Sequence, residues 1–477
     1  MTAPAMTPRA RAAFHRTIWR WHFWAGLLVA PVLLMLSLTG AIYLFNDELN
    51  DALYPELRHV IPSATSVPVS RMIGAALAAH PGTATRIDTP ATPDRSAVVF
   101  VTPRHGAPLR VAVDPGSGRV LGSVVYDRTL VGWADAMHRS MLLGVAGEWV
   151  IELAACWALV LLVTGVILWW PRGGWRGSGM LWPRLSGRGR RFWRDLHAPV
   201  GLWTVTLVGF LVVTGLPWAD VTGPMLHRLG AAAGIGYPPS FRQYGIPQSV
   251  PMKAALGDAP WTLEDAPMPR SSMAGHADHM PAVGTSLPSD PHVIQGTDRV
   301  AALLRARGWP PAYRLFLPME PSGVYTVFTY PDQPQGQRTL YVDRYSLRPI
   351  GAEVRFADYG LLGKATELGV QLHMGNYAGR PNQLVMLIPC IAIWTLTISG
   401  VAMWWKRRPA GRLGAPPPLS GARIRGLLVA LAVAGIVMPL FGASLVLVAA
   451  IDRLVAFVTA RRRLRPHRQV VGPDATG

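Results

Sequence analysis

Cysteine is nearly absent from the 477-residue chain, and the two that occur, Cys156 and Cys390, both lie inside apolar stretches. This excludes a disulfide framework and a metal site built from cysteine thiolates. Charged residues are scarce as well, at 15% of the chain against 50% hydrophobic residues. Because so few charges cannot cover several soluble domains, the composition indicates a membrane protein.

Acidic residues are the scarcer charged type, with 27 Asp and Glu against 46 Lys and Arg. The formal net charge of +19 is compatible with nucleic-acid binding, but the arginines flank apolar runs, where membrane topology places them. We therefore expect no nucleic-acid partner. We expect no nucleotide site either, because the glycine-rich segment 173–179 lacks the strand-turn-helix context of a dinucleotide fold.

Four apolar runs are long enough to cross about 30 Å of hydrocarbon as helices. They are Phe23–Phe45, Leu153–Trp170, Val200–Ala219 and Leu384–Trp405, of 23, 18, 20 and 22 residues. The first run follows a basic segment, but it is longer than the apolar part of a signal peptide and no small-residue cleavage site follows it. We expect it to be an uncleaved anchor.

The connections between these runs differ in charge, which predicts their side of the membrane. Residues 1–22 carry four basic and no acidic residues, residues 171–199 seven and one, and residues 406–425 six and none. Residues 46–148 carry nine and ten, and residues 220–383 fourteen and thirteen. The first three segments are therefore expected in the cytoplasm and the two long, nearly neutral connections outside.

A fifth apolar stretch, Gly426–Ile451, is followed by an arginine-rich tail that a single span would place outside, against the charge rule. Pro439 and Gly442 lie midway along it. Two short helices, at about 423–438 and 443–459, would return the tail to the cytoplasm. The sequence leaves open one span or a helical hairpin, and favours the hairpin.

Two motifs recur with identical spacing in the two halves of the chain. Spans one and three share a histidine followed by glycines four and eighteen positions later, namely His22, Gly26 and Gly40 in one and His197, Gly201 and Gly215 in the other. Spans two and four share a histidine that is followed 27 positions later by a glycine and 31 and 32 positions later by two tryptophans. In span two these residues are His138, Gly165, Trp169 and Trp170, and in span four they are His373, Gly400, Trp404 and Trp405. The chain is therefore predicted to contain an internal duplication.

The outer connections also match, because segment 114–122 aligns with segment 343–351. Each half contains a predicted helix (70–80 and 297–308) and three predicted strands (97–101, 109–113 and 119–125; 313–317, 324–330 and 338–343). The expected fold is a membrane α-helical bundle of two parallel repeats, each a span, an α+β module and a span, with a C-terminal hydrophobic segment or hairpin.

The predicted boundaries follow from these elements. They are tail and first span 1–45, first module 46–137, second span 138–170, basic loop 171–196, third span 197–219, insertion 220–296, second module 297–372, fourth span 373–405, basic loop 406–425, hydrophobic segment 426–459 and basic tail 460–477.

Parallel repeats place equivalent residues opposite one another at equal depth. His22 is then expected to face His197 (the first pair) and His138 to face His373 (the second pair), toward opposite membrane surfaces. Two imidazoles facing one axis are what a six-coordinate haem iron requires, and helical bundles build such sites from facing helices.

The four repeated glycines extend this prediction. Gly40 and Gly215 are expected at the depth of the second pair and Gly165 and Gly400 at that of the first, where they would let a flat macrocycle approach the backbone. The alternative is that such glycines serve helix packing, terminal tryptophans anchor at the interface, and single histidines are ordinary headgroup-level residues. Histidines at matching depth in both halves favour haem ligation.

Other histidines lack a counterpart in the second half. His15 lies seven residues before His22, on the same face of the predicted helix, and is a candidate substitute ligand. The others are interpreted as surface residues, namely His59, His80, His105, His227 and His467.

Together, segments 19–26, 114–122, 164–172 and 439–444, with Thr39–Gly40 and Leu372–His373, resemble the PepSY-associated transmembrane family. That family includes iron-regulated inner-membrane reductases that release iron from siderophores in the bacterial periplasm. The resemblance covers nearly the whole chain. It implies two b-type haems held by membrane histidines, periplasmic PepSY modules, and electrons carried outward to a ferric complex.

One segment departs from this pattern. Residues 268–280 are rich in His and Met, including Met273, His276, His279 and Met280. Thioether and imidazole ligands together suit copper, so these residues are a candidate metal site; the alternative is a Pro-rich insertion whose methionines have no role.

The expected function is therefore a haem-dependent transmembrane reductase of a ferric-siderophore, or of another Fe(III) or Cu(II) complex, with an external donor such as quinol or a cytoplasmic reductase. Two other functions remain open. A haem-free, membrane-anchored PepSY protein would bind a partner and tolerate changes at all four histidines. A transporter is less favoured, because the four spans contain no polar cluster apart from Glu152 near one end.

Overall fold

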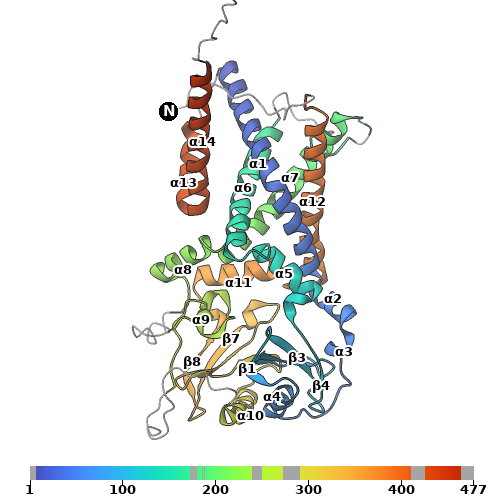
Figure 1. Cartoon of the computed structure of the whole chain (residues 1–477), viewed down its shortest axis with the longest axis vertical. Helices are drawn as coiled ribbons and strands as arrows, with labels where there is room; N and C mark the ends of the chain where they lie inside the picture. Colours follow the sequence, from blue (N-terminus) through green and yellow to red (C-terminus); the bar gives the residue numbers. More distant parts are fainter. Residues whose placement is uncertain are drawn as a thin grey trace, which may run out of the picture.

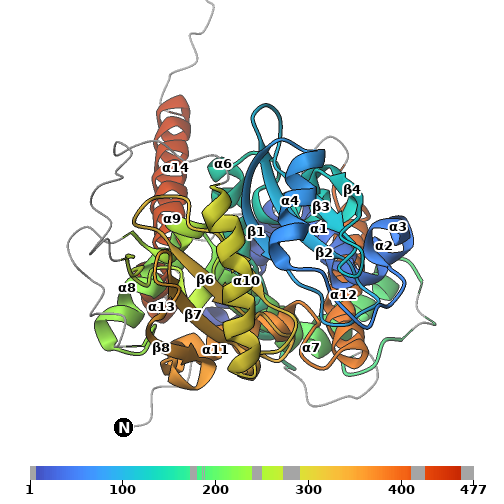
Figure 2. The same ribbon diagram turned by 90° about the horizontal axis from the view of Figure 1, so that it is seen from below.

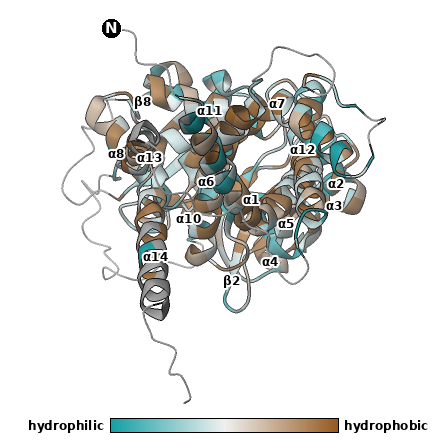
Figure 3. Cartoon of the chain, turned by 90° about the horizontal axis from the view of Figure 1, so that it is seen from above, coloured by the Kyte–Doolittle hydropathy of each residue, from teal (hydrophilic) through white to brown (hydrophobic). Residues whose placement is uncertain are grey.

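A computed structural model describes residues 7–171, 180–184, 186, 188–238, 250–271, 290–409 and 425–463. Four of its helices are long and apolar enough to cross a membrane: α1 (Pro8–Leu44), α6 (Val145–Trp169), α7 (Arg190–Gly215) and α12 (Arg380–Trp405). They lie side by side at one end of the molecule, and apolar residues dominate them (Figures 1 and 3). The four predicted spans are confirmed as helices of this kind.

These four helices form a bundle with a closed order of neighbours. α1 packs against α6, α6 against α7, α7 against α12, and α12 against α1. α1 and α7 are therefore diagonal to one another, so residues on their inner faces meet across the bundle interior. The close packing of small and apolar side chains is the usual basis of such contacts in membranes.

Two shorter helices, α5 (Leu130–Ser140) and α11 (Leu361–His373), lie crosswise between the bundle and the sheet (Figure 1). The predicted second and fourth spans, 138–170 and 373–405, include the ends of these two helices, but each helix ends before the spanning helix begins. Gly144 and Gly379 precede α6 and α12 with φ of +59° and +60°, a conformation that glycine adopts readily. His138 and His373 therefore lie on the crosswise helices.

Eight antiparallel strands form one sheet in the order β4-β3-β2-β1-β5-β6-β7-β8. The strands of the first half are β1 (Gly82–Asp88), β2 (Ala97–Pro103), β3 (Leu109–Val113) and β4 (Val120–Val124). Those of the second are β5 (Arg314–Phe316), β6 (Val324–Phe328), β7 (Arg338–Asp343) and β8 (Pro349–Arg355). Antiparallel pairing of β1 with β5 makes the two halves one sheet.

The two faces of the sheet differ. On the face away from the bundle lie α4 (Val69–Ala79) and α10 (Pro291–Ala306), side by side across the strands (Figure 2). Aliphatic side chains of both helices and of the strands form the main core there. On the other face, the second half is covered by the segment that contains α9 (Met252–Leu256) and η4 (Trp261–Leu263), packed on Phe328 and Tyr341.

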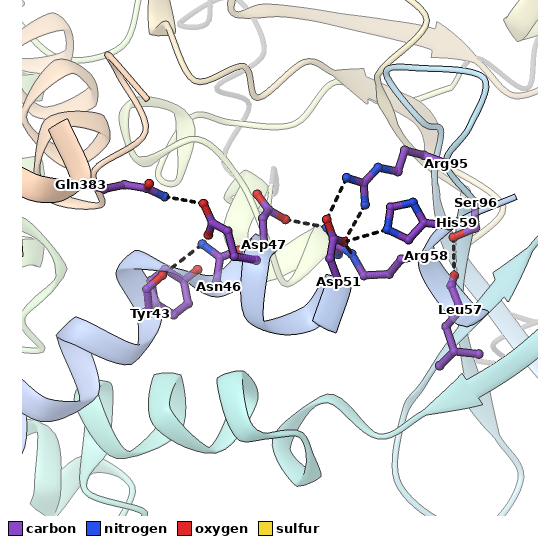
Figure 4. A network of polar contacts seen from close by, with 11 residues as sticks. Tyr43, Asn46, Asp47, Asp51, Leu57, Arg58, His59, Arg95, Ser96 and Gln383 are labelled. Carbon is purple, nitrogen blue, oxygen red and sulfur yellow. Dashed lines mark hydrogen bonds and ion pairs between the residues drawn. The ribbon is translucent and has the colours of Figure 1, made fainter. Parts of the chain in front are cut away.

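The end of α1 is followed by the short helices α2 (Asn46–Leu53) and α3 (Pro55–Arg58), which connect it to the sheet and to the bundle. Asp51 accepts two hydrogen bonds from Arg95, at 2.6 and 2.8 Å, and one from Arg58 (Figure 4). Gln383, near the start of α12, donates to the carbonyl of Leu44 at 2.9 Å. These contacts connect the first module to the bundle.

Beyond the third span, α8 (Thr222–Ala233) begins against Glu152 of α6. The buried Glu152 carboxylate accepts hydrogen bonds from the amides of Val221 and Thr222, at 2.9 and 3.1 Å. A carboxylate at this position satisfies amides that the helix itself leaves unpaired.

The C-terminal hydrophobic stretch contains two helices, α13 (Arg425–Val437) and α14 (Pro439–Arg463). The backbones of Gly435 and Gly442 contact one another across the turn between them. Phe441 of α14 is fully buried and packs edge-on against Trp157 of α6, at 5.3 Å between ring centres. The end of α14 lies at the same end of the bundle as the start of α1, as the hairpin interpretation predicts (Figure 1).

Candidate functional site

Each of the four repeated histidines is held by a hydroxyl group from another helix. The contacts join His22 Nδ1 to Thr164 Oγ1 (2.9 Å), His138 Nδ1 to Thr39 Oγ1 (3.0 Å), His197 Nδ1 to Ser399 Oγ (2.9 Å) and His373 Nδ1 to Thr214 Oγ1 (2.8 Å). Each hydroxyl belongs to the residue directly before one of the four repeated glycines. The structure therefore contains one local arrangement, histidine against hydroxyl and glycine, four times.

The hydroxyls determine which imidazole nitrogen carries the proton. Each donates its own proton to the carbonyl four residues earlier, at 2.6 to 2.8 Å, the acceptors being Met35, Val160, Phe210 and Thr395. The hydroxyl can then only accept from Nδ1, so Nδ1 is protonated and Nε2 keeps its lone pair. At His197, the carbonyl of Leu396, 3.1 Å from Nδ1, requires the same tautomer.

The Nε2 atoms are not used for folding. None of the four makes a hydrogen bond with any residue in the described ranges. An imidazole whose Nδ1–H is bonded to a neighbouring acceptor and whose Nε2 is available is the usual state of a metal-binding histidine. Each of the four imidazoles therefore has an available Nε2.

The repeated glycines make room for these imidazoles. A Cβ atom on Gly40 would lie 3.3 Å from Cε1 of His138, and one on Gly165 would lie 3.4 Å from Cε1 of His22. The corresponding distances at Gly215 and Gly400 are 3.8 and 3.7 Å, from His373 and His197 respectively. Each glycine thus lies at the depth that the sequence spacing predicts, and its neighbour in the structure is the imidazole itself.

The first pair meets across the diagonal of the bundle. The ring centres of His22 and His197 are 6.4 Å apart, with the ring planes 84° to one another. Imidazole nitrogens bind first-row metal ions at about 2.0–2.1 Å, so two imidazoles that share one ion have ring centres about 6 Å apart. The separation in the structure suits a shared metal ion.

The second pair lies on the crosswise helices. His138 and His373 are half-buried and lie within electrostatic range of one another. Burial lowers the pKa of each to about 4 from an ordinary value of 6.5. Both imidazoles are therefore neutral near pH 7, which is the state that a metal ion requires.

These residues suit a metal group that needs only two protein ligands. No group of three or more His, Cys, Asp or Glu side chains suited to a metal ion occurs within the part of the chain that the structure describes. Two imidazoles alone complete a haem iron, because the porphyrin supplies the other four nitrogens. His22 with His197, and His138 with His373, are the residues that would hold two such groups.

The candidate copper ligands Met273, His276, His279 and Met280 lie outside the described residues. The described neighbour Met268 is buried in the apolar cover of the sheet, where it packs in the cluster around Tyr341. The copper site stays a prediction.

A family model described as the PepSY-associated TM region matches residues 19–407. The protein belongs to this family. The match spans the bundle, the crosswise helices and the whole sheet, so it includes all four histidines and their hydroxyl partners. No curated protein matches the chain.

Two features of this PepSY-associated transmembrane protein were not predicted from its sequence. The hydroxyls of Thr164 and Ser399 support histidines of other helices, and the shared small polar residue before each glycine was the available signal. His227 was interpreted as a surface residue, but its side chain is only 9% exposed and stacks on Trp261 at 4.0 Å, beside Glu264. The covering segment that buries it was not visible in local patterns.

Proposed function

We propose that this protein is a haem-containing transmembrane reductase that delivers electrons to a ferric-siderophore, or to another Fe(III) or Cu(II) complex, on the sheet side of the membrane. The observation that carries the proposal is the fourfold arrangement in which a hydroxyl fixes the Nδ1–H tautomer and leaves Nε2 available. A purely structural histidine needs no such repeated support.

When bound, a b-type haem supplies a one-electron Fe(III)/Fe(II) couple whose potential the surrounding protein adjusts. The chain's own residues would do four things. The imidazoles would bind the haem iron, and the hydroxyls would orient the imidazoles. The glycines would leave space for the imidazoles, and the crosswise helices would shield the second pair from water. Shielding favours a defined potential, because solvent access is one of the factors that set it.

The charge distribution supports the direction of transfer. The arginine-rich connections are expected in the cytoplasm, and the sheet follows the two nearly neutral connections, so the sheet is expected on the periplasmic side of a bacterial inner membrane. A cytoplasmic or quinol donor would then act at the end nearer the first pair. Reduction of a ferric complex weakens the hold of hard oxygen ligands on iron and so releases the metal.

We also propose that the two halves are parallel repeats. In both, a spanning helix precedes a helix and four strands, then a crosswise helix and a second span. In both, the first span's histidine contacts the second span's hydroxyl, and the crosswise helix's histidine contacts the first span's hydroxyl.

The test is a haem count on the purified full-length protein, together with its visible spectrum when oxidised and when reduced with dithionite. We expect about two b-type haems per chain in the wild type. Alanine at either member of a pair should remove one haem, and alanine at His105, an exposed histidine on the sheet side, should remove none.

A colourless protein from haem-replete cells would refute the proposal and favour a membrane-anchored binding or regulatory protein. A transporter has less support in the structure, because the buried carboxylate of Glu152 in α6 accepts hydrogen bonds from the amides of Val221 and Thr222 at the start of α8.

A further inference from the structure

A group of polar side chains between the second pair and the sheet has no role in the arrangement described so far. We call Tyr43, Arg110, Tyr126, Asp135 and Tyr330 the polar cluster. Tyr43 lies three residues after Gly40 on α1, and Asp135 lies three residues before His138 on α5, so both are within one helical turn of the second pair.

Arg110 is the centre of this cluster, and its guanidinium forms no ion pair with a described carboxylate, although Asp88 and Asp135 lie within electrostatic range. Its guanidinium stacks on the ring of Tyr126, 3.5 Å from the ring centre, and lies 5.3 Å from that of Phe100. It makes no hydrogen bond or ion pair with any described residue. By contrast, the adjacent arginines of the same sheet face, Arg86 and Arg314, both bind Asp258. A half-buried guanidinium without an acceptor is costly, so an acceptor is expected there.

The side chains of the other members of the cluster also lack hydrogen-bond partners among the described residues. The Tyr43 hydroxyl lies within electrostatic range of Asp135 and Arg110, and Tyr330 lies within range of Tyr43. Burial raises the pKa of Asp135, while Arg139 and Arg110 act against this shift. The cluster therefore presents one guanidinium, three phenol hydroxyls and one carboxyl group, none of which has a hydrogen-bond partner among the described residues.

This arrangement occurs in one half of the chain only. At the spacings that relate the two halves, Tyr43 corresponds to Trp218, Arg110 to Thr339, and Asp135 to Val370. A cluster needed to join the sheet to the bundle would be expected in both halves. A cluster that serves one asymmetric ligand is expected in one.

We propose that Arg110 and Tyr43 form a carboxylate-binding site for the propionate groups of the haem held by His138 and His373. The inference rests on the proposed function. A guanidinium and a phenol donate to carboxylate oxygens in fixed directions, which suits Arg better than Lys. The half-buried position between α5 and the sheet suits a small carboxylate, whereas a bulky metal chelate would need an open surface.

The test is a redox titration of the purified, haem-loaded protein, followed by visible spectroscopy without substrate. The haem of the second pair is identified as the one lost in His373→Ala. Because Arg110 adds positive charge beside this haem and favours its reduced form, Arg110→Gln should shift its Fe(III)/Fe(II) equilibrium at least tenfold toward Fe(III). For a one-electron couple this lowers the midpoint potential by about 59 mV. Tyr43→Phe, which removes only a hydroxyl, should shift the same haem less and in the same direction.

The matched control is Arg119→Gln, which removes the same charge from an exposed residue beyond the far end of β3 and should leave both potentials unchanged. If Arg110→Gln loses haem, Tyr43→Phe carries the measurement, because Arg110→Lys would keep the positive charge. Unchanged potentials in Arg110→Gln, or in Tyr43→Phe where Arg110→Gln loses haem, with two haems present would overturn the inference. A raised KM for a ferric complex with unchanged potentials would also overturn it and would assign the site to substrate. A wild type without haem would instead refute the proposed function itself.

Discussion

The hydroxyl partners of the histidines allow a sharp test of the ligand arrangement. Thr164→Val keeps the shape of the side chain and removes the acceptor for the Nδ1–H of His22, 2.9 Å away. A buried donor left without its partner costs about 1–3 kcal/mol. At about 1.4 kcal/mol for each factor of ten, haem bound at the first pair should be held about 5- to 150-fold less tightly. Losses of about 10- to 100-fold are typical when such supporting contacts are removed.

The four sites should not respond equally. Each of the four histidines also lies near a backbone carbonyl, those of Leu161, Leu36, Leu211 and Leu396. That of Leu396 lies 3.1 Å from Nδ1 of His197, in addition to the hydroxyl partner of this histidine. Its Nδ1–H therefore keeps an acceptor when Ser399 becomes alanine. We expect Ser399→Ala to cost about 1 kcal/mol or less, and Thr164→Val and Thr214→Val to cost more.

The assay is the rate of haem loss to an excess of a haem-scavenging protein, followed by absorbance for each variant. Thr→Ser at positions 164 and 214 keeps the hydroxyl and should restore near-wild-type retention. Thr395→Val is the matched control, because this exposed hydroxyl of α12 bonds only to its own helix, at Ile391. Equal retention in all the hydroxyl-free variants, or the greatest loss in Ser399→Ala, would refute the reasoning.

Three further results are expected. Gly40→Ala should lower haem retention at the second pair more than Gly215→Ala, because its new Cβ would lie 3.3 Å rather than 3.8 Å from an imidazole carbon; haem counts of the two variants check this. Glu152→Ala should lower the thermal unfolding midpoint by an amount equivalent to about 1–3 kcal/mol, since three donors at the start of α8, two of them buried, lose their acceptor; an unchanged midpoint would contradict it. Hydrogen bonding to Arg95 lowers the pKa of Asp51 to about 2 from 3.8, so its stabilising contribution is complete above pH 3.8 and is lost as the pH falls toward 2; the unfolding midpoint of Asp51→Asn should be less acid-sensitive in that window than the wild type's.

The membrane part of the fold was predictable because lipid imposes simple rules on sequence. Each span is a long run without charge, and each crosses as a helix since every backbone group must be satisfied within the segment. The breaks before α6 and α12 were less visible, because apolar residues such as Leu142 and Leu143 continue into the turn. Only the glycines at 144 and 379 indicate the change of direction.

The sheet was predicted as two separate modules, with β1 and β8 missing. β1 mixes polar and apolar residues, and its place was decided by pairing with β2 and, across the two halves, with β5. β8 is an edge strand with several exposed positions, so no buried face marks it in the sequence. Pairing between segments more than 200 residues apart is a tertiary effect that local patterns do not contain.

The positions of the candidate ligands were predictable from repetition, and their chemistry was not. Identical spacings placed His22 opposite His197 and each glycine at the right depth. Which nitrogen of each imidazole is free depends on a hydroxyl of another helix, more than 90 residues away in every case. The polar cluster could not be found by repetition at all, because it lacks a counterpart in the second half.

The two histidine pairs depend on one another, because the hydroxyl that contacts each histidine belongs to a different helix. α1 carries His22 of the first pair and Thr39, which supports His138 of the second. α7 likewise carries His197 and Thr214, which supports His373. Each of these helices therefore joins both sites over 17 residues, about 25 Å of helix. A rotation of α1 that displaced His22 from the first pair would also withdraw the hydroxyl from His138, so a change that loosens one end of either helix should disturb ligation at both sites.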